Sequence, residues 1–232
     1  MKVYASIHVG SFGISLKVFE IVKGKRVRQI DEKRRRMDLS QDILLHDKLS
    51  REHLLEIIDT LRDMKETILS YKADDFDVYA GFALQSASNA QTLIDQAALA
   101  TGMQIQILDN SRQRFIVYKA LCSMEHFSEL VSELTVIVDA GGSGVQLTLF
   151  SDGKLLHTQH VYLGATNIWD NLRKIRQSAD SREALLKMLY AEIESFADTF
   201  LGEQIPKRLI IINNPIVSIK RARLEKKEGF FS

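Results

Sequence analysis

The chain contains a single cysteine, Cys122, and only two prolines, Pro206 and Pro215. One thiol excludes an intramolecular disulfide framework and a cysteine-rich metal site, and it is typical of proteins from a reducing compartment. No apolar run approaches the roughly 18 residues of a membrane-spanning helix, and no basic segment followed by an apolar one opens the chain. We therefore expect a cytoplasmic protein that has no membrane partner.

The chain also lacks an excess of either charge. Its 31 Lys and Arg residues oppose 30 Asp and Glu residues, which leaves a formal net charge of +1. A protein-wide field that recruits nucleic acid or anionic membrane is therefore not expected, and any anion site has to be local. Basic runs occur at 33–36, within the basic strand expected at 26–37, and in the tail at 220–231. We expect a charge-protected edge strand at the first and a solubilising tail at the second, in preference to an acidic partner or nucleic acid.

What the sequence does have is clear periodicity. Apolar patterns predict three strands, an amphipathic helix that begins after Ser50, and then alternating strands and helices. In this first series, strands are expected at 2–9, 14–22, 26–37, 76–84 and 103–108, with helices at 51–72, 88–102 and 110–127. The second series consists of a three-stranded meander within 135–164, helices at 165–176 and 181–202, and a strand at 208–213.

The segment SIHVGSFGISLKVFE, at 6–20, is nearly repeated as IVDAGGSGVQLTLFS, at 137–151. When His8 is placed opposite Asp139, the glycines and an apolar face of the two segments coincide. The coinciding pairs are Gly10 and Gly141, Gly13 and Gly144, Leu16 and Leu147, and Phe19 and Phe150. A repeat at a spacing of about 130 residues indicates a duplicated domain and not a solenoid. We expect an N-terminal lobe at 1–127 and an abbreviated C-terminal lobe at 128–232.

Glycine in a hairpin turn lets backbone N–H groups approach a phosphate, because glycine has no Cβ and tolerates positive φ. Two such hairpins that face each other across a cleft would grip a phosphate chain from both sides, while Asp139 would hold a metal-bound water. The alternative for each hairpin is that glycine only permits a tight turn or a bulge. The candidate phosphate-binding residues are Gly10, Ser11, Gly13, Gly141, Gly142, Ser143 and Gly144.

Four segments of the chain resemble the exopolyphosphatase and guanosine pentaphosphate phosphatase family. The chain reads H-V-G-S-F-G at 8–13, A-G-F-A-L-Q-S-A-S-N at 80–89, T-G-M-Q-I-Q-I-L-D-N-S-R-Q-R-F-I-V-Y at 101–118, and D-A-G-G-S-G-V-Q-L at 139–147. The family reads roughly D-x-G-S-N-S, A-T-S-A-x-R-x-A-x-N, T-G-x-x-x-x-I-x-S-G-x-E-E-A-R-x-x-Y and D-x-G-G-G-S-T-E-L in these places. It is a branch of the superfamily of actin, heat-shock chaperones and sugar kinases. The resemblance implies an α/β fold of two ribonuclease H-like (actin-like ATPase) lobes, each a mixed sheet of the five-stranded type with helices, the second abbreviated.

The resemblance also implies which positions carry the chemistry, and most of them are replaced. The family's metal-, phosphate- and water-binding positions hold His8, Gln85, Arg112, Gln113 and Gln146 in this chain. Asp139 is the acid that is kept, so the resemblance implies that it is catalytic and that it binds Mg²⁺ or Mn²⁺. A glutamine cannot take the proton of an attacking water, and a missing general base costs about 10²- to 10⁴-fold in rate.

Three functional hypotheses follow from this pattern. The first is a protein that binds polyphosphate or a phosphorylated nucleotide between its lobes and hydrolyses phosphoanhydride bonds weakly if at all. The alternative is a non-catalytic sensor or scaffold of the same fold, including a homodimer partner. A kinase or filament protein is disfavoured, because Asn213 and Asn214 stand where its adenosine-binding glycines are expected.

For several individual residues, the sequence allows both a functional and a structural role. His8 is either a base near neutral pH or, as we favour, a structural histidine at a strand end. Arg112 either binds phosphate or is a solvated helix residue. Asp109, beside the replaced glutamate pair, is a candidate to take over its role. His157 and His160, three apart on one expected strand, should face opposite sides and are not expected to bind one metal.

Overall fold

The computed structural model describes residues 1–22, 27–124, 126–141, 144–161 and 179–212. The chain divides into two compact units, Met1–Tyr118 and Lys119–Ser232. The division falls within helix α5 (Asn110–Cys122), whereas the sequence places the boundary after this helix, at residue 127. Among the described residues, no helix is both long and apolar enough to cross a membrane.

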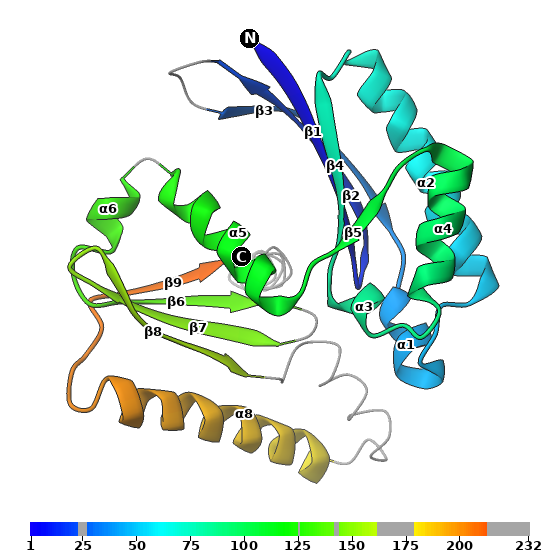
Figure 1. Ribbon diagram of the computed structural model, residues 1–232. Coiled ribbons are helices and arrows are strands. Elements are labelled where there is room, and N and C mark those ends of the chain that lie inside the picture. The colour runs from blue at the N-terminus through cyan, green and yellow to red at the C-terminus, as the bar shows by residue number, and fades with distance from the viewer. Residues whose placement is uncertain (23–26, 125, 142–143, 162–178, 213–232) are drawn as a thin grey trace, which may run out of the picture. The chain divides into compact units, whose positions relative to one another are not determined.

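The first unit is built on a five-stranded mixed sheet with the strand order β3-β2-β1-β4-β5 (Figure 1). The strands β1, β2 and β3 form an antiparallel meander, and β4 and β5 continue the sheet in parallel with β1. The strands are β1 (Lys2–Gly10), β2 (Gly13–Ile21), β3 (Val27–Arg36), β4 (Asp75–Ala80) and β5 (Ile105–Ile107), and the helices are α1 (Leu39–His46), α2 (Arg51–Ser70), α3 (Phe82–Gln85), α4 (Ala90–Thr101) and α5. The predicted series of strands and longer helices is confirmed.

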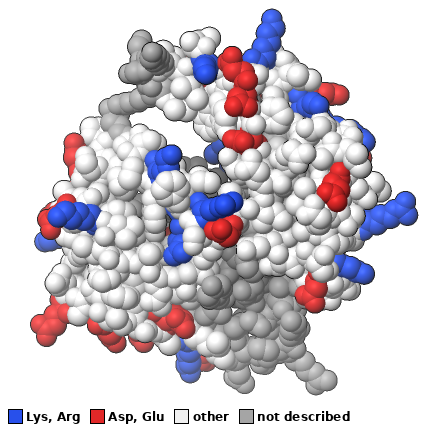
Figure 2. All heavy atoms as spheres, viewed as in Figure 1, with Lys and Arg blue, Asp and Glu red and all other residues white. Residues whose placement is uncertain are grey.

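The basic edge strand β3 is balanced by acidic neighbours. Lys33 lies 2.6 Å from Asp63 of α2, and Arg35 lies 3.2 Å from Glu56 of the same helix. In Figure 2, Lys and Arg side chains are interspersed with Asp and Glu over the visible surface, without a broad area of one sign. This agrees with the prediction of a charged, solvated edge strand.

Two short helices of the first unit, α1 and α3, are not predicted from the sequence. The start of α1 is held by the turn between β1 and β2, because the N–H groups of Leu39 and Ser40 both donate to the Ser11 carbonyl, at 3.0 and 3.2 Å. Helix α3 occupies the end of the segment predicted as a strand through residue 84. Its Gln85 N–H donates to the Gly81 carbonyl at 3.3 Å. Helix α1 depends on contacts with a residue that is distant in sequence, and α3 is only a single turn long. Neither feature gives a periodic signal in the sequence.

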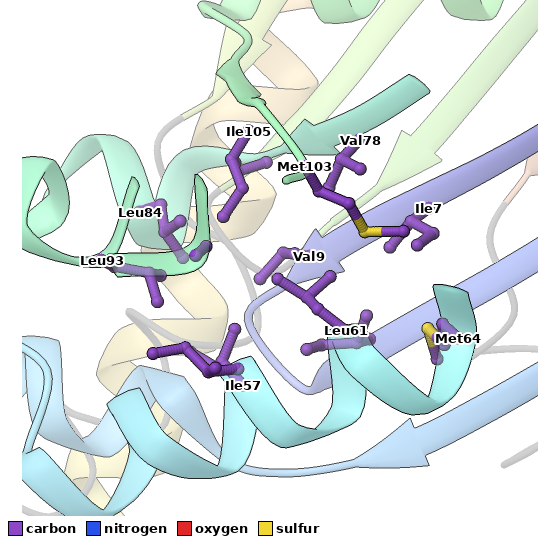
Figure 3. Packing of buried hydrophobic residues seen from close by; sticks show 14 of the residues in the cluster. Ile7, Val9, Ile57, Leu61, Met64, Val78, Leu84, Leu93, Met103 and Ile105 are labelled. Carbon is purple, nitrogen blue, oxygen red and sulfur yellow. The ribbon is translucent and has the colours of Figure 1, made fainter. Parts of the chain in front are cut away.

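The core of the first unit lies between its sheet and the helices α2 and α4, which cover one face (Figure 1). Alternation along β1 points Ile7 and Val9 to that face, where both are inaccessible to solvent. The helical period of α2 brings Ile57, Leu61 and Met64 against them (Figure 3). Burying a side chain of this size contributes about 1.5 to 3 kcal/mol, so this layer fixes the sheet that carries the first hairpin.

The other face of β1 and β4 carries polar side chains. The hydroxyl groups of Tyr4 and Tyr79 both donate to the carboxylate of Asp77, Tyr79 at 2.9 Å. Desolvation, reinforced by this carboxylate, raises the pKa of Tyr4 well above its usual value. Tyr4 therefore remains a neutral donor. His8 lies on this same polar face, two pleats along β1.

The second unit has a smaller, four-stranded sheet with the order β8-β7-β6-β9 (Figure 1). Its described elements are α6 (Phe127–Leu130), β6 (Thr135–Ala140), β7 (Val145–Ser151), β8 (Lys154–Val161), α8 (Ala179–Phe200) and β9 (Arg208–Ile212). Phe196 of α8 packs with Leu147 and Leu149 on one face, and Phe127 meets Phe150 edge to face on the other. The expected fold class, two α/β units with the second abbreviated, is confirmed. The helix predicted at 165–176 lies outside the described residues.

The start of α2 depends on one half-buried carboxylate. Asp42 accepts hydrogen bonds from the Ser50 N–H at 2.6 Å and from the His53 ring at 2.7 Å, while the Ser50 hydroxyl caps the helix at the His53 N–H. Partial burial raises the pKa of Asp42, but the hydrogen bonds from Ser50 and His53 outweigh it and hold the pKa below its usual value. The folded state therefore favours the charged carboxylate.

We expect Asp42→Asn to destabilise the protein by about 1 to 3 kcal/mol at pH 7, because it removes a charge-assisted network. Since the folded-state pKa is lowered, this stabilisation is present above the unfolded-state value near 3.8 and is lost as the pH falls through the folded value. Urea denaturation at several pH values measures the difference between the two proteins. A difference that stays constant from pH 7 to pH 2 would contradict the assignment.

We expect Gly13→Ala to destabilise the protein by more than about 3 kcal/mol, because a Cβ at its φ of 141° would lie 2.2 Å from the Arg35 carbonyl oxygen. Gly102→Ala is the matched control in the same unit. It has a φ of 71°, but no atom lies closer to its Cβ position than Lys65 Nζ at 3.5 Å. Its cost should be about 1 kcal/mol, from backbone strain alone. Equal losses in urea denaturation would show that φ, and not the close approach of β3, makes Gly13 necessary.

Candidate functional site

The first glycine hairpin joins β1 to β2 and pairs Gly10 with Gly13. Its Ser11 and Phe12 carbonyls accept hydrogen bonds from the backbone of residues 37–40, so the turn is anchored to the start of α1. The close approach of β3 explains Gly13 without any ligand. Gly10 is less constrained, because the nearest atom to a Cβ there is Cε1 of His8, at 3.1 Å. Of the two glycines, Gly10 is therefore limited by a side chain and not by the backbone of a neighbouring strand.

Three of the replaced family positions gather around Gly81, at the end of β4. A Cβ on Gly81 would lie 2.9 Å from Nε2 of Gln113 and 3.5 Å from Nε2 of His8. Gln85 is one turn away, with its N–H on the Gly81 carbonyl and its side chain exposed. The fold therefore brings together positions that are distant in sequence, as the resemblance implies, but it does so with one imidazole and two amides.

His8 is exposed on the polar face of the sheet. Desolvation lowers the pKa of His8. The imidazole is therefore neutral at neutral pH, and it offers a phosphate a hydrogen bond and not a positive charge.

The neighbouring Arg112 and Asp109 contact each other. The Arg112 N–H donates to the Asp109 carboxylate at 2.8 Å, and the Arg112 guanidinium lies 3.8 Å from the same carboxylate. Both side chains are largely exposed. Asp109 therefore caps the start of α5, which gives this acid a structural task.

The second glycine hairpin joins β6 to β7. Its turn is closed by the Gly141 N–H, which donates to the Gly144 carbonyl at 2.8 Å. A Cβ on Gly144 would lie 2.5 Å from both Nε2 of His160 and the Val161 carbonyl oxygen, whereas the nearest atom to one on Gly141 is 3.5 Å away. Gly144 is therefore required by the packing of β8, and Gly141 has room beside it. The candidates Gly142 and Ser143 lie outside the described residues.

Gln146, where the family has a glutamate, is buried and only 6% exposed. Its Nε2 donates to the Gln159 carbonyl at 2.8 Å and to the Thr158 hydroxyl, which ties the side chain to β8. Its Oε1 is buried and accepts no hydrogen bond from any described residue. A carboxylate has no N–H to donate. The family's glutamate could therefore not make the hydrogen bonds by which the Gln146 amide holds β8.

Asp139, the acid that is kept, is half-buried at the end of β6, directly across from Gln146 on β7. Within the described ranges, no three His, Cys, Asp or Glu side chains form a cluster that could hold a metal ion. A single carboxylate does not make a cage for a divalent cation. It fits Mg²⁺ that is held mainly by water and by the phosphates of a ligand, which is a common arrangement for this ion.

The structure brings one further residue to this hairpin that was not among the candidates. The register of β7 and β8 places His160 across from Gln146, on the face opposite α8. His157 faces the other way and stacks on Phe200 of α8 with ring centroids 4.3 Å apart. This confirms that the two histidines lie on opposite sides of the sheet. The alternation of side chains along a strand predicts that the two histidines lie on opposite faces. It does not predict that His160 lies beside the glycine turn.

Two of three comparisons with known proteins found matches. Residues 17–209 match the model of the Ppx/GppA phosphatase family. Among solved structures, the chain is similar to an Aquifex aeolicus member of the Ppx/GppA family, with 18% identity and a TM-score of 0.71 over 92% of this chain and 66% of that chain. It is also similar to an exopolyphosphatase from Cytophaga hutchinsonii, with 15% identity and a TM-score of 0.80 over 100% of this chain and 73% of that chain. No curated protein sequence matches it.

The sequence identity to these structures is below 20%, so the similarity establishes the fold alone. The chain spans slightly less than two thirds of the Aquifex aeolicus protein. The family model, by contrast, covers most of this chain, including the second hairpin, Gln85 and Gln113, but it begins after His8 and the first hairpin. The chain therefore belongs to the Ppx/GppA phosphatase family.

Proposed function

We propose that this protein binds polyphosphate or a phosphorylated nucleotide and hydrolyses its phosphoanhydride bonds slowly. The observation that carries the proposal is the family match over residues 17–209, together with the two glycine hairpins, in which no backbone atom lies within 3.4 Å of a Cβ position at Gly10 or Gly141. Backbone N–H groups at such turns bind phosphate oxygens without a charged side chain. That one phosphate chain is gripped by both hairpins stays a prediction from the sequence.

The slow rate follows from the side chains around these turns. Phosphoryl transfer needs an oriented water and a way to neutralise the spreading negative charge, usually with metal ions held by carboxylates. Here Asp139 supplies a carboxylate at the second hairpin, and His8, Gln113 and Gln146 supply none. A rate reduced by at least about 10²-fold relative to a member with the full set is the expected consequence.

When a divalent cation, Mg²⁺ or Mn²⁺, is bound, it neutralises negative charge on the transferred phosphoryl group. Asp139 is the residue that would hold it, through water and in company with the phosphates. His8 is neutral at neutral pH and does not replace this charge. Cys122 is an exposed free thiol, which fits the cytoplasmic location that we propose.

A second candidate function is a non-catalytic sensor or scaffold that binds the same ligands, including one that acts as a homodimer. The buried amide of Gln146 favours it, because both N–H groups of this side chain donate to β8 and hold the amide in place as a structural group. The two functions share the ligand and differ in turnover. Calorimetry and phosphate release, measured on the same sample, separate them.

We expect the protein to bind tripolyphosphate in calorimetry and to release phosphate slowly from polyphosphate or guanosine pentaphosphate, only with Mg²⁺ or Mn²⁺. Asp139→Ala should abolish the release, because it removes the carboxylate that holds the ion. Asp198→Ala, an exposed change on α8 of the same unit, is the control and should leave release unchanged. Binding without any release would favour the sensor. If neither phosphate chains nor phosphorylated nucleotides bind, the proposal is wrong.

We expect Gln146→Glu not to restore catalysis, although it restores the family's residue. The carboxylate would face the Gln159 carbonyl, now 2.8 Å from Nε2, with no N–H to donate, and a buried unpaired charge of this kind costs at least about 1 to 3 kcal/mol. Thermal unfolding should show this loss. Gln113→Glu, at a half-buried position, is the control and should unfold near the wild-type temperature. A stable Gln146→Glu variant with greatly increased phosphate release would refute this account of Gln146.

A further inference from the structure

The basic strand β3 ends beside the first glycine hairpin. Its last residue, Arg36, pairs with Gly13, the first residue of β2. The two backbones are so close that a Cβ on Gly13 would lie 3.1 Å from the Arg36 Cα atom. The next residue, Met37, donates its N–H to the Phe12 carbonyl of the turn at 3.4 Å. Arg36 is therefore the basic residue of β3 that the register places nearest to the turn.

Four of the five basic residues of β3 have a carboxylate partner. The pairs are Arg28 with Glu20, Lys33 with Asp63, Arg34 with Glu32, and Arg35 with Glu56. The fifth, Arg36, is exposed, and within the described ranges its side chain makes no ion pair or hydrogen bond. The acid two residues further on, Asp38, accepts a hydrogen bond from the Ser40 hydroxyl instead. Arg36 therefore carries a positive charge that the described residues leave uncompensated.

Arg36 lies on the polar face of the sheet, the face that also carries His8. Its neighbour Arg35 pairs with the core residue Ile14 and binds Glu56 of α2, so Arg35 is on the opposite, helix-covered face. Side chains alternate along a strand, which puts Arg36 on the polar face. The residue across from it is a glycine, so β2 places no side chain between Arg36 and the hairpin.

The backbone of the turn is suited to an anion. The carbonyls of Ser11 and Phe12 accept hydrogen bonds from the N–H groups of residues 37–40. The N–H groups of Ser11 and Phe12, by contrast, have no acceptor among the described residues. Such N–H groups can donate to phosphate oxygens, but they supply no net charge. His8 does not supply it either, since its imidazole is neutral at neutral pH.

We propose that Arg36 is a phosphate-binding residue of the first hairpin, with its guanidinium bound to oxygens of the phosphate group that the Ser11 and Phe12 N–H groups contact. A guanidinium is always charged, and its planar fork of donors matches phosphate. This inference rests on the proposed function. It gives a role to a residue outside the four segments that resemble the family. The ligand class is a chain of phosphates, either free or attached to a nucleoside.

Calorimetry of three variants with tripolyphosphate tests the assignment. Arg36→Gln removes the charge and should weaken binding by about tenfold or more, as for loss of hydrogen bonds to a charged group. Arg36→Lys keeps the charge without the planar fork and should recover part of the affinity. Arg35→Gln is the matched control on the opposite face of the same strand. It should bind like the wild type, since the Arg35 guanidinium is held by Glu56.

Salt dependence gives a readout that a purely structural role would not change. Binding of phosphates by a cationic side chain weakens as the salt concentration rises. The affinity of Arg36→Gln should therefore depend less on salt than that of the wild type, whereas Arg35→Gln should keep the wild-type dependence. An unchanged salt dependence in Arg36→Gln would contradict a charge contact.

Parallel titrations with guanosine pentaphosphate identify the source of the phosphate chain, because the wild type binds the free chain, the nucleotide or both. If it binds both, Arg36→Gln should weaken both by a similar factor. A loss confined to guanosine pentaphosphate would place the contact on the nucleoside and overturn the assignment to phosphate.

The remaining outcomes separate this assignment from the proposed function. If the wild type binds and Arg36→Gln binds equally well, the assignment of Arg36 is wrong while the proposed function stands. If Arg35→Gln loses as much affinity as Arg36→Gln, the effect comes from the overall charge of β3, and the assignment also fails. If the wild type binds neither ligand, both the assignment and the proposed function fail.

Discussion

In both units, the third strand of the meander lies so close to the second that the glycine leading the second strand can carry no side chain. A Cβ on Gly13 would meet the Arg35 carbonyl oxygen at 2.2 Å, and one on Gly144 would meet the Val161 carbonyl oxygen at 2.5 Å. Gly13 and Gly144 occupy equivalent positions in the internal repeat. The strands that exclude their side chains, β3 and β8, are equivalent as well. The same backbone constraint therefore shapes both hairpins.

This constraint separates the glycines that packing requires from those that a ligand can use. Gly141 has room at its Cβ position, and the closest contact at Gly10 is the side chain of His8 at 3.1 Å, whereas backbone oxygens lie within 2.5 Å at Gly13 and Gly144. Around Gly10 and Gly141, the chain presents imidazole and amide groups, with Asp139 as the acid that the family pattern retains. Such groups can bind phosphate by hydrogen bonds, but they are poorly suited to activate water or to collect metal ions. Retained hairpins and replaced carboxylates together favour ligand binding over rapid hydrolysis.

Much of the fold could be predicted from the sequence, because it depends on local periodicity. The meander, α2 and α4 follow from alternation, helical spacing and caps such as Ser50 and Gly102. The N-terminus of α1 could not be predicted, because its N–H groups bind the distant carbonyl of Ser11. The gathering of His8 and Gln113 at Gly81 was implied by the resemblance to a family and not by spacing.

The position of His160 beside the glycine turn could not be predicted, for a specific reason. The Asp152–Gly153 turn pairs Ser151 with Lys154, and an uninterrupted ladder from that turn would place Gln159 across from Gln146. An irregularity between Leu149 and Phe150 skips Leu156 and moves His160 into that place. A one-residue shift exchanges the faces of all residues beyond it, and a bulge of this kind has no clear signal in a single sequence.

The central claim is that the chain binds phosphate chains while lacking the groups for rapid hydrolysis. Phosphorus NMR of tripolyphosphate with the wild-type protein and Mg²⁺ observes both properties in one sample. The account predicts that the tripolyphosphate signals broaden or shift on addition of protein and that orthophosphate appears only slowly. Sharp, unshifted signals would contradict the binding, and rapid conversion to orthophosphate would contradict the claim that the replaced carboxylates limit the chemistry.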